Sequence, residues 1–198
     1  MISFAITGGI GSGKSYVSDL LEQRGIPIYN ADKEAKHLML SDEVIRQGLI
    51  SLLGNDVYQN DELNKPLLAQ YLFSDASHAQ KINSIVHPRV KADFYRWKEE
   101  QQGTEIVGME CAILFEAGFA DAVDKVVMVY APLAIRLERA MKRDSATREQ
   151  ILARISAQMD DEEKRQKSDL VVYNDGTTPL DIQLEDLLTH LQQGNMQQ

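Results

Sequence analysis

A cluster of glycines near the N-terminus constrains the fold of this chain more than any other feature. From Ile6 the sequence reads ITGGIGSGKSYVSDLL, in which four glycines fall within six residues and lead into Lys14 and Ser15. Glycine is costly to order, so such a cluster marks a place where the backbone takes unusual dihedral angles or approaches something closely. An apolar run precedes the cluster and an amphipathic pattern follows it, which predicts a strand, a loop and a helix in that order.

The loop satisfies the phosphate-binding pattern G-x-x-x-x-G-K-[ST], from Gly8 to Ser15. In this pattern backbone N–H groups cradle phosphates, the lysine reaches the β and γ oxygens, and the Ser or Thr hydroxyl holds Mg²⁺. A dinucleotide-binding fingerprint would need a third glycine where Lys14 stands, and a purely structural turn is the remaining alternative. The pattern predicts a nucleoside triphosphate site at these residues: Gly8, Gly9, Ile10, Gly11, Ser12, Gly13, Lys14, Ser15 and Tyr16.

Short apolar runs recur along the chain, and helical patterns lie between them. This alternation predicts an α/β fold in which five parallel strands form an open sheet flanked by helices. Ligands of such sheets bind at the carboxyl ends of the strands, where the glycine loop begins. The five predicted strands are 2–7, 26–29, 105–109, 125–130 and 169–174.

Two stretches interrupt the alternation and predict insertions into a single domain. The gap between the second and third predicted strands is too long for one crossover connection, and it holds helical patterns. The second stretch follows the fourth strand, is rich in charge and has few large apolar residues to anchor it. The predicted division is a nucleotide-binding core at 1–30, 102–141 and 168–198, a helical acceptor subdomain at 31–101 and a helical lid at 142–167.

The charge and composition of the chain exclude several kinds of partner. A formal net charge of -9 argues against a general nucleic-acid binder and against anionic membranes. The lone Cys111 cannot form an internal disulfide, and the start MISFAIT lacks the features of a signal peptide. No apolar run approaches the ~18 residues that suggest a membrane span. We therefore expect a cytoplasmic protein, with a monomer favoured and its oligomeric state left open.

Among users of nucleoside triphosphates, the sequence favours small-molecule kinases. A guanine-reading N-K-x-D motif is missing, since the Asn64-Lys65 pair is followed by Pro and Leu. The length of 198 residues leaves little room for the scaffold of a motor or transporter ATPase. A small-molecule kinase needs an acceptor insertion after the second strand and a basic lid after the fourth, and both are present. The alternative outside enzymes is a nucleotide-gated binding protein that barely turns over.

Asp32 follows the second predicted strand directly. Its carboxylate should therefore stand at the carboxyl edge of the sheet, near the glycine loop. There it could take the proton of an acceptor hydroxyl as the phosphoryl group arrives. A cap for a helix that starts at Lys33 explains the same position equally well.

A helical pattern after the fourth strand carries a basic stripe that is predicted to point away from the core. For any single arginine a solvated face is the simpler interpretation. A basic cluster after a phosphate loop nevertheless favours contacts with the transferring phosphoryl group. The stripe consists of Arg136, Arg139 and Arg143, and another face of the same helix carries Leu133, Leu137 and Met141.

The histidines predict no metal bound by the protein alone. Their spacing is not that of metal ligands, and the single cysteine offers no partner for a zinc site. We therefore expect Mg²⁺ only together with ATP. One of the histidines, His87, precedes Pro88, a pair that predicts a helix stop, a turn or a helix start. The four histidines are His37, His78, His87 and His190.

Over its whole length the chain resembles dephospho-CoA kinases. The resemblance implies ATP-dependent phosphorylation of the ribose 3′-hydroxyl of dephospho-CoA, the last step of coenzyme A synthesis. It also implies a P-loop kinase core with a CoA-binding subdomain and a lid. The segments that carry the resemblance, in the family's order and spacing, are ITGGIGSGKS from Ile6, NADKEAKHLM from Asn30, VHPRV from Val86, ILFEAGF from Ile113, RAMKRD from Arg139 and SDLVVYNDG from Ser168.

The resemblance assigns roles to residues that match the family's motifs. It implies that Lys14 and Ser15 bind the phosphates and Mg²⁺, and that Asp32 is the catalytic base. It also implies that Arg139 and Arg143 contact ATP from the lid, with Arg143 counted among the catalytic residues. Asp32 and His87 are the implied contacts with the acceptor substrate.

Three positions depart from the family's usual residues. Tyr16 stands where threonine is usual, Glu110 where we expect aspartate, and Ala112 where we expect proline. Glu110 directly follows the third predicted strand and is the nearest candidate for an acidic Mg²⁺ partner, with a water molecule bridging its carboxylate to the ion. The rival among enzymes is another kinase of the nucleoside-monophosphate-kinase type with a different small acceptor.

Overall fold

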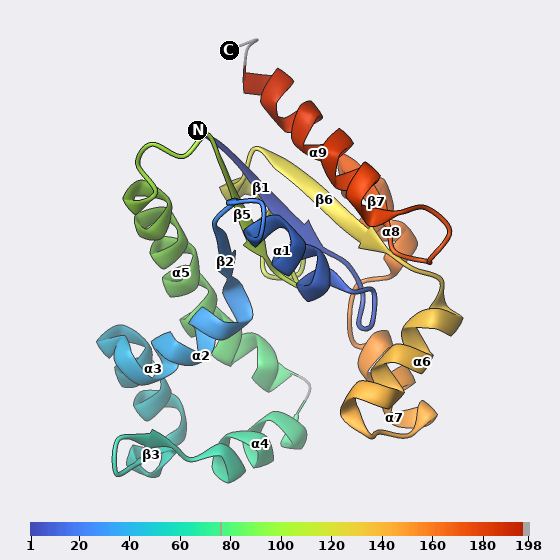
Figure 1. Ribbon diagram of the computed structural model, residues 1–198. Helices are drawn as coiled ribbons and strands as arrows, with labels where there is room; N and C mark the ends of the chain where they lie inside the picture. Colours follow the sequence, from blue (N-terminus) through green and yellow to red (C-terminus); the bar gives the residue numbers. More distant parts are fainter. Residues whose placement is uncertain (76, 196–198) are drawn as a thin grey trace. The chain divides into compact units, whose positions relative to one another are not determined.

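The computed structural model describes residues 1–75 and 77–195 (Figure 1). The chain divides into two compact units, Met1–Asn30 with Lys98–Gln198, and Ala31–Trp97. The first unit holds the main sheet and the glycine loop, and the second is mostly helical.

Five parallel strands form the main sheet, which confirms the predicted fold class. Their order is β2-β5-β1-β6-β7, so that β1 is central and is flanked by β5 and β6. The glycine loop leaves the central strand at the carboxyl edge, between the ends of its two neighbours. Each strand lies within two residues of a predicted run: β1 Ile2–Thr7, β2 Ile28–Asn30, β5 Ile106–Glu110, β6 Lys125–Tyr130 and β7 Leu170–Tyr173.

The main core lies between this sheet and two helices, α1 (Lys14–Glu22) and α9 (Leu180–Asn195). Figure 1 shows both helices in front of the strands. Their buried side chains share one cluster with inward-facing residues of β1, β6 and β7, which fixes α1 and therefore the end of the glycine loop. Members of this cluster include Phe4, Ile6, Val17, Leu21, Val127, Val172, Leu184 and Leu187.

Three helices lie between β6 and β7 in the first unit. α6 (Leu133–Asp144) and α7 (Arg148–Ser156) share a small apolar cluster. α8 (Asp161–Lys167) packs beside β6 and leads into β7. A short 3-10 turn, η2 (Ala120–Ala122), precedes β6. The predicted lid segment thus consists of the end of α6 with α7 and α8.

The predicted faces of α6 are wrong at two positions. Arg136, expected to point away from the core, is only 3% exposed, whereas Leu133, expected on the apolar face, is 46% exposed. The reason is that α6 lies against the glycine loop and α8 as well as against α7, so it has a second buried face. A helical period alone cannot reveal such a face.

The charged segment that ends the predicted lid is anchored more firmly than its composition indicates. Lys164 of α8 is completely buried. Its Nζ donates to the backbone oxygen of Ala112 at 2.9 Å and pairs with Glu116 at 3.1 Å. Glu116 also accepts the backbone N–H of Met159 at 2.8 Å. A buried, fully engaged ammonium fixes this helix to the segment that follows β5.

The second unit is built from four helices and one hairpin among its described residues. The hairpin turns at Asn60 and Asp61, whose φ angles are 52° and 64°. Asn and Asp tolerate such angles better than most residues, which explains this two-residue turn. The elements are α2 Ala31–Ser41, α3 Glu43–Leu53, η1 Asn55–Val57, β3 Tyr58–Gln59, β4 Glu62–Leu63, α4 Lys65–Ser74 and α5 Ser77–Glu100.

Pro88 does not stop a helix, which corrects the predicted helix end at His87. It lies inside α5. A proline in a helix interior costs about 3 kcal/mol. Burying one large apolar side chain contributes about 1.5–3 kcal/mol, so four of them outweigh that cost. Four buried side chains follow one another at a spacing of four along the helix: Ile82, Val86, Val90 and Phe94.

Within the described part of the chain, no helix is both long enough and apolar enough to cross a membrane.

Candidate active site

The glycine loop takes a backbone conformation that favours glycine at three of its positions, Gly8, Gly11 and Gly13. Gly8 has φ 144° and Gly13 has φ 94°. A Cβ atom on Gly8 would collide with the backbone oxygen of Val129 in β6, and one on Gly13 would collide with the side-chain amide of Asn174. The loop is therefore held closely by the ends of β6 and β7. Within the loop, the backbone N–H of Ser12 donates to the backbone oxygen of Gly9 at 3.2 Å, which closes a turn inside the phosphate-binding pattern.

Lys14 is the first residue of α1 and reaches back over the loop. Its Nζ donates to the backbone oxygens of Gly8 at 2.9 Å and Gly9 at 3.2 Å. The ammonium group therefore lies inside the loop at the helix N-terminus, where the partial positive charge of the helix adds to its own. Both charges favour an anion at this place.

Three elements bring oxygen and amide groups together beside Lys14. Ser15 Oγ donates to Glu110 Oε1 at 2.7 Å, and Asn30 Nδ2 donates to Glu110 Oε2 at 3.0 Å. Glu110 is 8% exposed. The parallel pairing of β2 with β5 sets Asn30 opposite Glu110. Asn30 was not predicted as a site residue, although it ends β2 two residues before Asp32.

This arrangement fits Mg²⁺ chemically. A hydroxyl and a carboxylate are oxygen ligands of the kind that Mg²⁺ prefers, and they lie next to a loop built for phosphates, which supply further oxygens. Across residues 1–75 and 77–195, no three His, Cys, Asp or Glu side chains gather as a metal site. A magnesium ion would therefore depend on phosphate oxygens as well as on Ser15 and Glu110.

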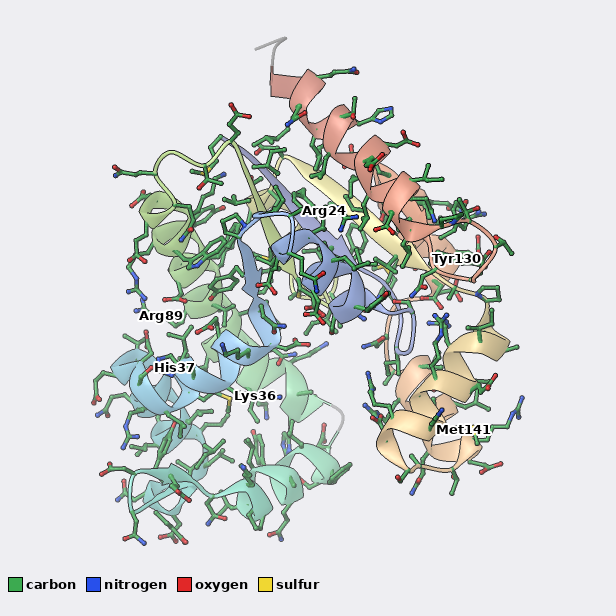
Figure 2. The ribbon with its side chains drawn as sticks, in the orientation of Figure 1. Arg24, Lys36, His37, Arg89, Tyr130 and Met141 are labelled. Atoms are coloured by element: carbon green, nitrogen blue, oxygen red, sulfur yellow. The ribbon has the colours of Figure 1, made fainter. Side chains whose placement is uncertain are left out.

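A cavity of about 230 Å³ opens beside the loop. Two of the three stripe arginines, Arg139 and Arg143, reach it from α6. The structure thus brings these two predicted site residues together at this cavity, whereas Arg136 does not line it and packs on the backbone of Gly9 and Gly11 instead. In Figure 2, the helix that carries these arginines, α6, can be found by the label of Met141, and the end of the preceding strand β6 by the label of Tyr130. The cavity is lined by Gly11, Gly13, Lys14, Ser15, Tyr16, Arg139, Ala140 and Arg143.

Arg139 is positioned by a residue that the sequence analysis also missed. Its Nη1 donates to the backbone oxygen of Asn174 at 2.9 Å, and the Asn174 amide donates to the backbone oxygen of Ser12 at 2.8 Å. Asn174 directly follows β7. It therefore joins the loop, α6 and the last strand, and the signals in the sequence were its place at the end of the last predicted strand and within the segment SDLVVYNDG.

Arg143 is exposed and bound to its neighbour in the chain. Its Nε donates to Asp144 at 2.7 Å and its Nη2 at 3.1 Å, and Arg154 of α7 donates to the same carboxylate at 2.6 Å. These hydrogen bonds from Arg143 and Arg154 hold the pKa of Asp144 well below its usual range. Arg143 would have to exchange Asp144 for phosphate oxygens in order to bind ATP directly.

Asp32 lies in the first turn of α2, which begins at Ala31. The interpretation that it caps a helix starting at Lys33 is therefore wrong, because the helix has already begun and Asp32 has helical geometry. Its side chain is exposed. Within residues 1–75 and 77–195, no residue forms a hydrogen bond or an ion pair with its carboxylate. Asp32 follows Asn30, the Glu110 partner, by two residues in the chain.

His87 lies within the second unit on α5 and is partly buried. Burial lowers its pKa, so the imidazole is neutral at pH 7. Figure 2 labels Arg89, two residues further along this helix. Arg89 Nη2 pairs with Asp42 at 2.7 Å, and Asp42 Oδ1 accepts the backbone N–H of Ile45 at 3.0 Å at the start of α3. The acceptor contact of His87 stays a prediction.

Comparisons with known proteins point to one family. The family model that matches the chain is that of dephospho-CoA kinase, over residues 2–179. The chain is 52% identical over 192 residues to the dephospho-CoA kinase of Bacteroides fragilis. The aligned residues cover 97% of this chain and 94% of that protein.

Solved structures share the fold. A protein from Thermus thermophilus has a TM-score of 0.81 at 32% identity, with 96% of this chain and 97% of that chain covered. Dephospho-CoA kinase from Campylobacter jejuni has a TM-score of 0.70 at 23% identity, with 98% of each chain covered. At that identity the second likeness shows the fold alone.

Proposed function

The chain belongs to the dephospho-CoA kinase family, and from this membership we infer that it transfers the γ-phosphoryl group of ATP to the ribose 3′-hydroxyl of dephospho-CoA. The product is coenzyme A, and the reaction is the last step of its biosynthesis. The observation that carries the proposal is the meeting of Lys14, Ser15 and Glu110 beside the glycine loop, in a chain that matches the family almost from end to end.

The phosphate end of the site consists of the glycine loop with the side chains around it. We propose that residues 8–16 hold the phosphates of ATP through backbone N–H groups, and that Lys14 neutralises charge on the transferred group. Arg139 and Arg143 contact ATP from α6. Bound Mg²⁺ supplies electrostatic stabilisation of the phosphate oxygens. Ser15 and Glu110 would hold it, Glu110 through a water molecule.

The acceptor end requires a base for the ribose hydroxyl. We propose Asp32 for this role, because its carboxylate is exposed and engaged by no hydrogen bond or ion pair in the part of the chain that the structure describes. A carboxylate free of internal partners can accept the proton of the incoming hydroxyl. His87, kept neutral by burial, is the second proposed contact of the acceptor, and residues 31–101 form the acceptor subdomain.

The remaining partners follow from charge and composition. We propose that the protein works in the cytoplasm as a monomer, with ATP and dephospho-CoA as substrates and neither nucleic acid nor membrane as a partner. The net charge of -9 supports the last two statements, because phosphate-rich surfaces would repel the chain. The basic side chains beside the glycine loop, Lys14, Arg139 and Arg143, form a local positive region that we assign to the ATP site.

The substrate assignment is tested by turnover. Purified protein with Mg-ATP is expected to convert dephospho-CoA to coenzyme A, measured by chromatography of the product together with ADP release. AMP and shikimate serve as alternative hydroxyl acceptors at equal concentration and should support little turnover. Fast phosphorylation of either, with none of dephospho-CoA, would move the assignment to another small-molecule kinase. ATP binding without turnover of any acceptor would favour the nucleotide-gated binding protein.

We propose further that residues 142–167 form a lid that closes over ATP. In the absence of nucleotide, α7 is expected to exchange its amide hydrogens rapidly, because Ile151 is its one buried residue. α8 should exchange more slowly, because Lys164 anchors it. A non-hydrolysable ATP analogue should slow exchange across α7, as measured by mass spectrometry.

A variant separates closure from simple ligand contact. Arg143→Ala should blunt the protection that the analogue confers on α7 and should lower kcat, because closure brings Arg143 to the phosphates. The matched control is Arg148→Ala, which removes an exposed arginine from α7 itself. Equal protection of α7 with and without nucleotide would mean a fixed flap and would contradict the lid.

A further inference from the structure

The third arginine of the basic stripe on α6, Arg136, has partners for only part of its guanidinium. The side chain is 4% exposed, and its Nη2 pairs with the carboxylate of Asp161 at the start of α8. Its Nε and Nη1 are buried and have no acceptor within residues 1–75 and 77–195. A buried cationic donor without an acceptor bears the full cost of its desolvation. The site therefore favours a ligand that brings anionic oxygens.

One of the two unpartnered nitrogens, Nη1, lies against the glycine loop. A Cβ atom on Gly9 would collide with Arg136 Nη1, and one on Gly11 would collide with the backbone oxygen of Arg136. Gly9 is also the residue whose backbone oxygen accepts from Lys14 Nζ at 3.2 Å. Arg136 therefore packs on the bare backbone next to the lysine that the motif assigns to the β and γ phosphates.

The carboxylate of Asp161 lies close enough to Lys14 for the two charges to interact. Burial raises the pKa of Asp161, and the charges of Arg136, Lys164 and Lys14 oppose that rise. Asp161 is thus a carboxylate within the field of the phosphate-binding lysine. An anion bound at Lys14 would repel Asp161 and attract Arg136, so the two would respond to it in opposite ways.

We propose that Arg136 is a third phosphate-binding arginine, which donates from its unpartnered nitrogens to the γ-phosphoryl oxygens of ATP, and that Asp161 holds it in place and competes with the phosphate for it. Arg136 shares a helical stripe with Arg139 and Arg143, which both line the phosphate cavity one and two turns further along α6. The proposal rests on ATP being the phosphoryl donor of the proposed function. It does not depend on which acceptor is used.

The test compares the affinities for ATP and ADP by isothermal titration in the presence of Mg²⁺ and without acceptor. Arg136→Gln is expected to weaken ATP binding about ten- to a hundredfold, the range for a charged hydrogen bond to phosphate, and ADP binding by less than about threefold. Asp161→Asn is expected to strengthen ATP binding a few-fold and to leave ADP binding unchanged, because it removes a competitor for the guanidinium.

A matched control uses another ion-paired arginine of the same unit. Arg24 pairs with Asp181 at 2.5 Å and is labelled in Figure 2. Arg24→Gln should leave both affinities unchanged. If Arg136 merely ties α6 to α8, Arg136→Gln and Asp161→Asn should impair ATP and ADP binding by the same factor, and this result would overturn the proposal.

If Arg136→Gln does not fold, the ATP affinity of Asp161→Asn still tests the proposal. Weaker ATP binding in that variant would contradict the proposed competition between Asp161 and the phosphate for the guanidinium of Arg136. Arg136→Lys, which keeps the charge, should restore part of the preference for ATP over ADP. Failure of the proposed substrate would appear separately, as wild-type protein that binds ATP and does not convert dephospho-CoA.

Discussion

Replacing Lys14 by alanine is expected to lower kcat by about 10²–10³-fold, the usual cost of removing one group that stabilises charge in a transition state. The ammonium lies inside the glycine loop at 2.9 Å from the backbone oxygen of Gly8, where a transferred phosphoryl group would meet it. ATP binding should also weaken, because the lysine acts on the bound phosphates as well. Steady-state turnover with dephospho-CoA, together with calorimetry of ATP binding, measures both effects.

The control for charge alone is Lys142→Ala, which removes an exposed lysine from α6 and leaves the loop intact. It should keep kcat within about twofold, as surface substitutions usually do. The contrary outcome for Lys14→Ala is a near-normal kcat with a lower melting temperature. That result would mean that Lys14 only ties the oxygens of Gly8 and Gly9 together, and that the phosphates are held by the backbone alone.

The sheet could be predicted because each of its strands is short, apolar and placed between helical patterns. Strands buried on both faces of a parallel sheet read as continuous apolar runs, such as KVVMVY in β6. The glycine loop could be predicted because its spacing is fixed by the phosphate chemistry. The resemblance to a family then added residues that no spacing rule identifies.

What escaped prediction depends on tertiary contacts. The run DDEEKRQK has the composition of a solvated helix, yet Lys164 within it is completely buried. Its ammonium group contacts the backbone oxygen of Ala112 and the carboxylate of Glu116, which both lie in the segment after β5. Arg136 is buried for a similar reason, with Asp161 as its partner. No local pattern indicates a partner that lies 25 or more residues away in the chain.

Asn30 and Asn174 illustrate the same limit within the site. Each directly ends or follows a strand, at the edge where ligands bind. Each holds a residue that had been predicted, Asn30 holding Glu110 and Asn174 holding Arg139. Asparagine is common in loops and at strand ends, so its presence alone does not reveal a role. The pairing of β2 with β5 brings Asn30 to Glu110, and the packing of α6 and the glycine loop against the end of β7 brings Asn174 to Arg139 and Ser12.

Asp32→Asn is expected to lower kcat by about 10²–10⁴-fold, the usual range for a general base, with little change in ATP affinity. The amide keeps the size and shape of the side chain but cannot accept the proton of the ribose hydroxyl. Stability should change by less than about 0.5 kcal/mol, because the carboxylate is exposed. Turnover, calorimetry of ATP binding and a thermal melt give the three quantities.

The matched control is Glu34→Gln, because Glu34 is the other acidic residue in the first turn of α2. Acidic side chains near a helix N-terminus stabilise the helix by about 0.3–1 kcal/mol through its dipole. If Asp32 serves only this purpose, both variants should lower the melting temperature alike and spare kcat. A large loss of kcat in Asp32→Asn, with normal turnover in Glu34→Gln, would separate proton transfer from helix stabilisation, because the two carboxylates share the first turn of α2 and only one of them is proposed as the base.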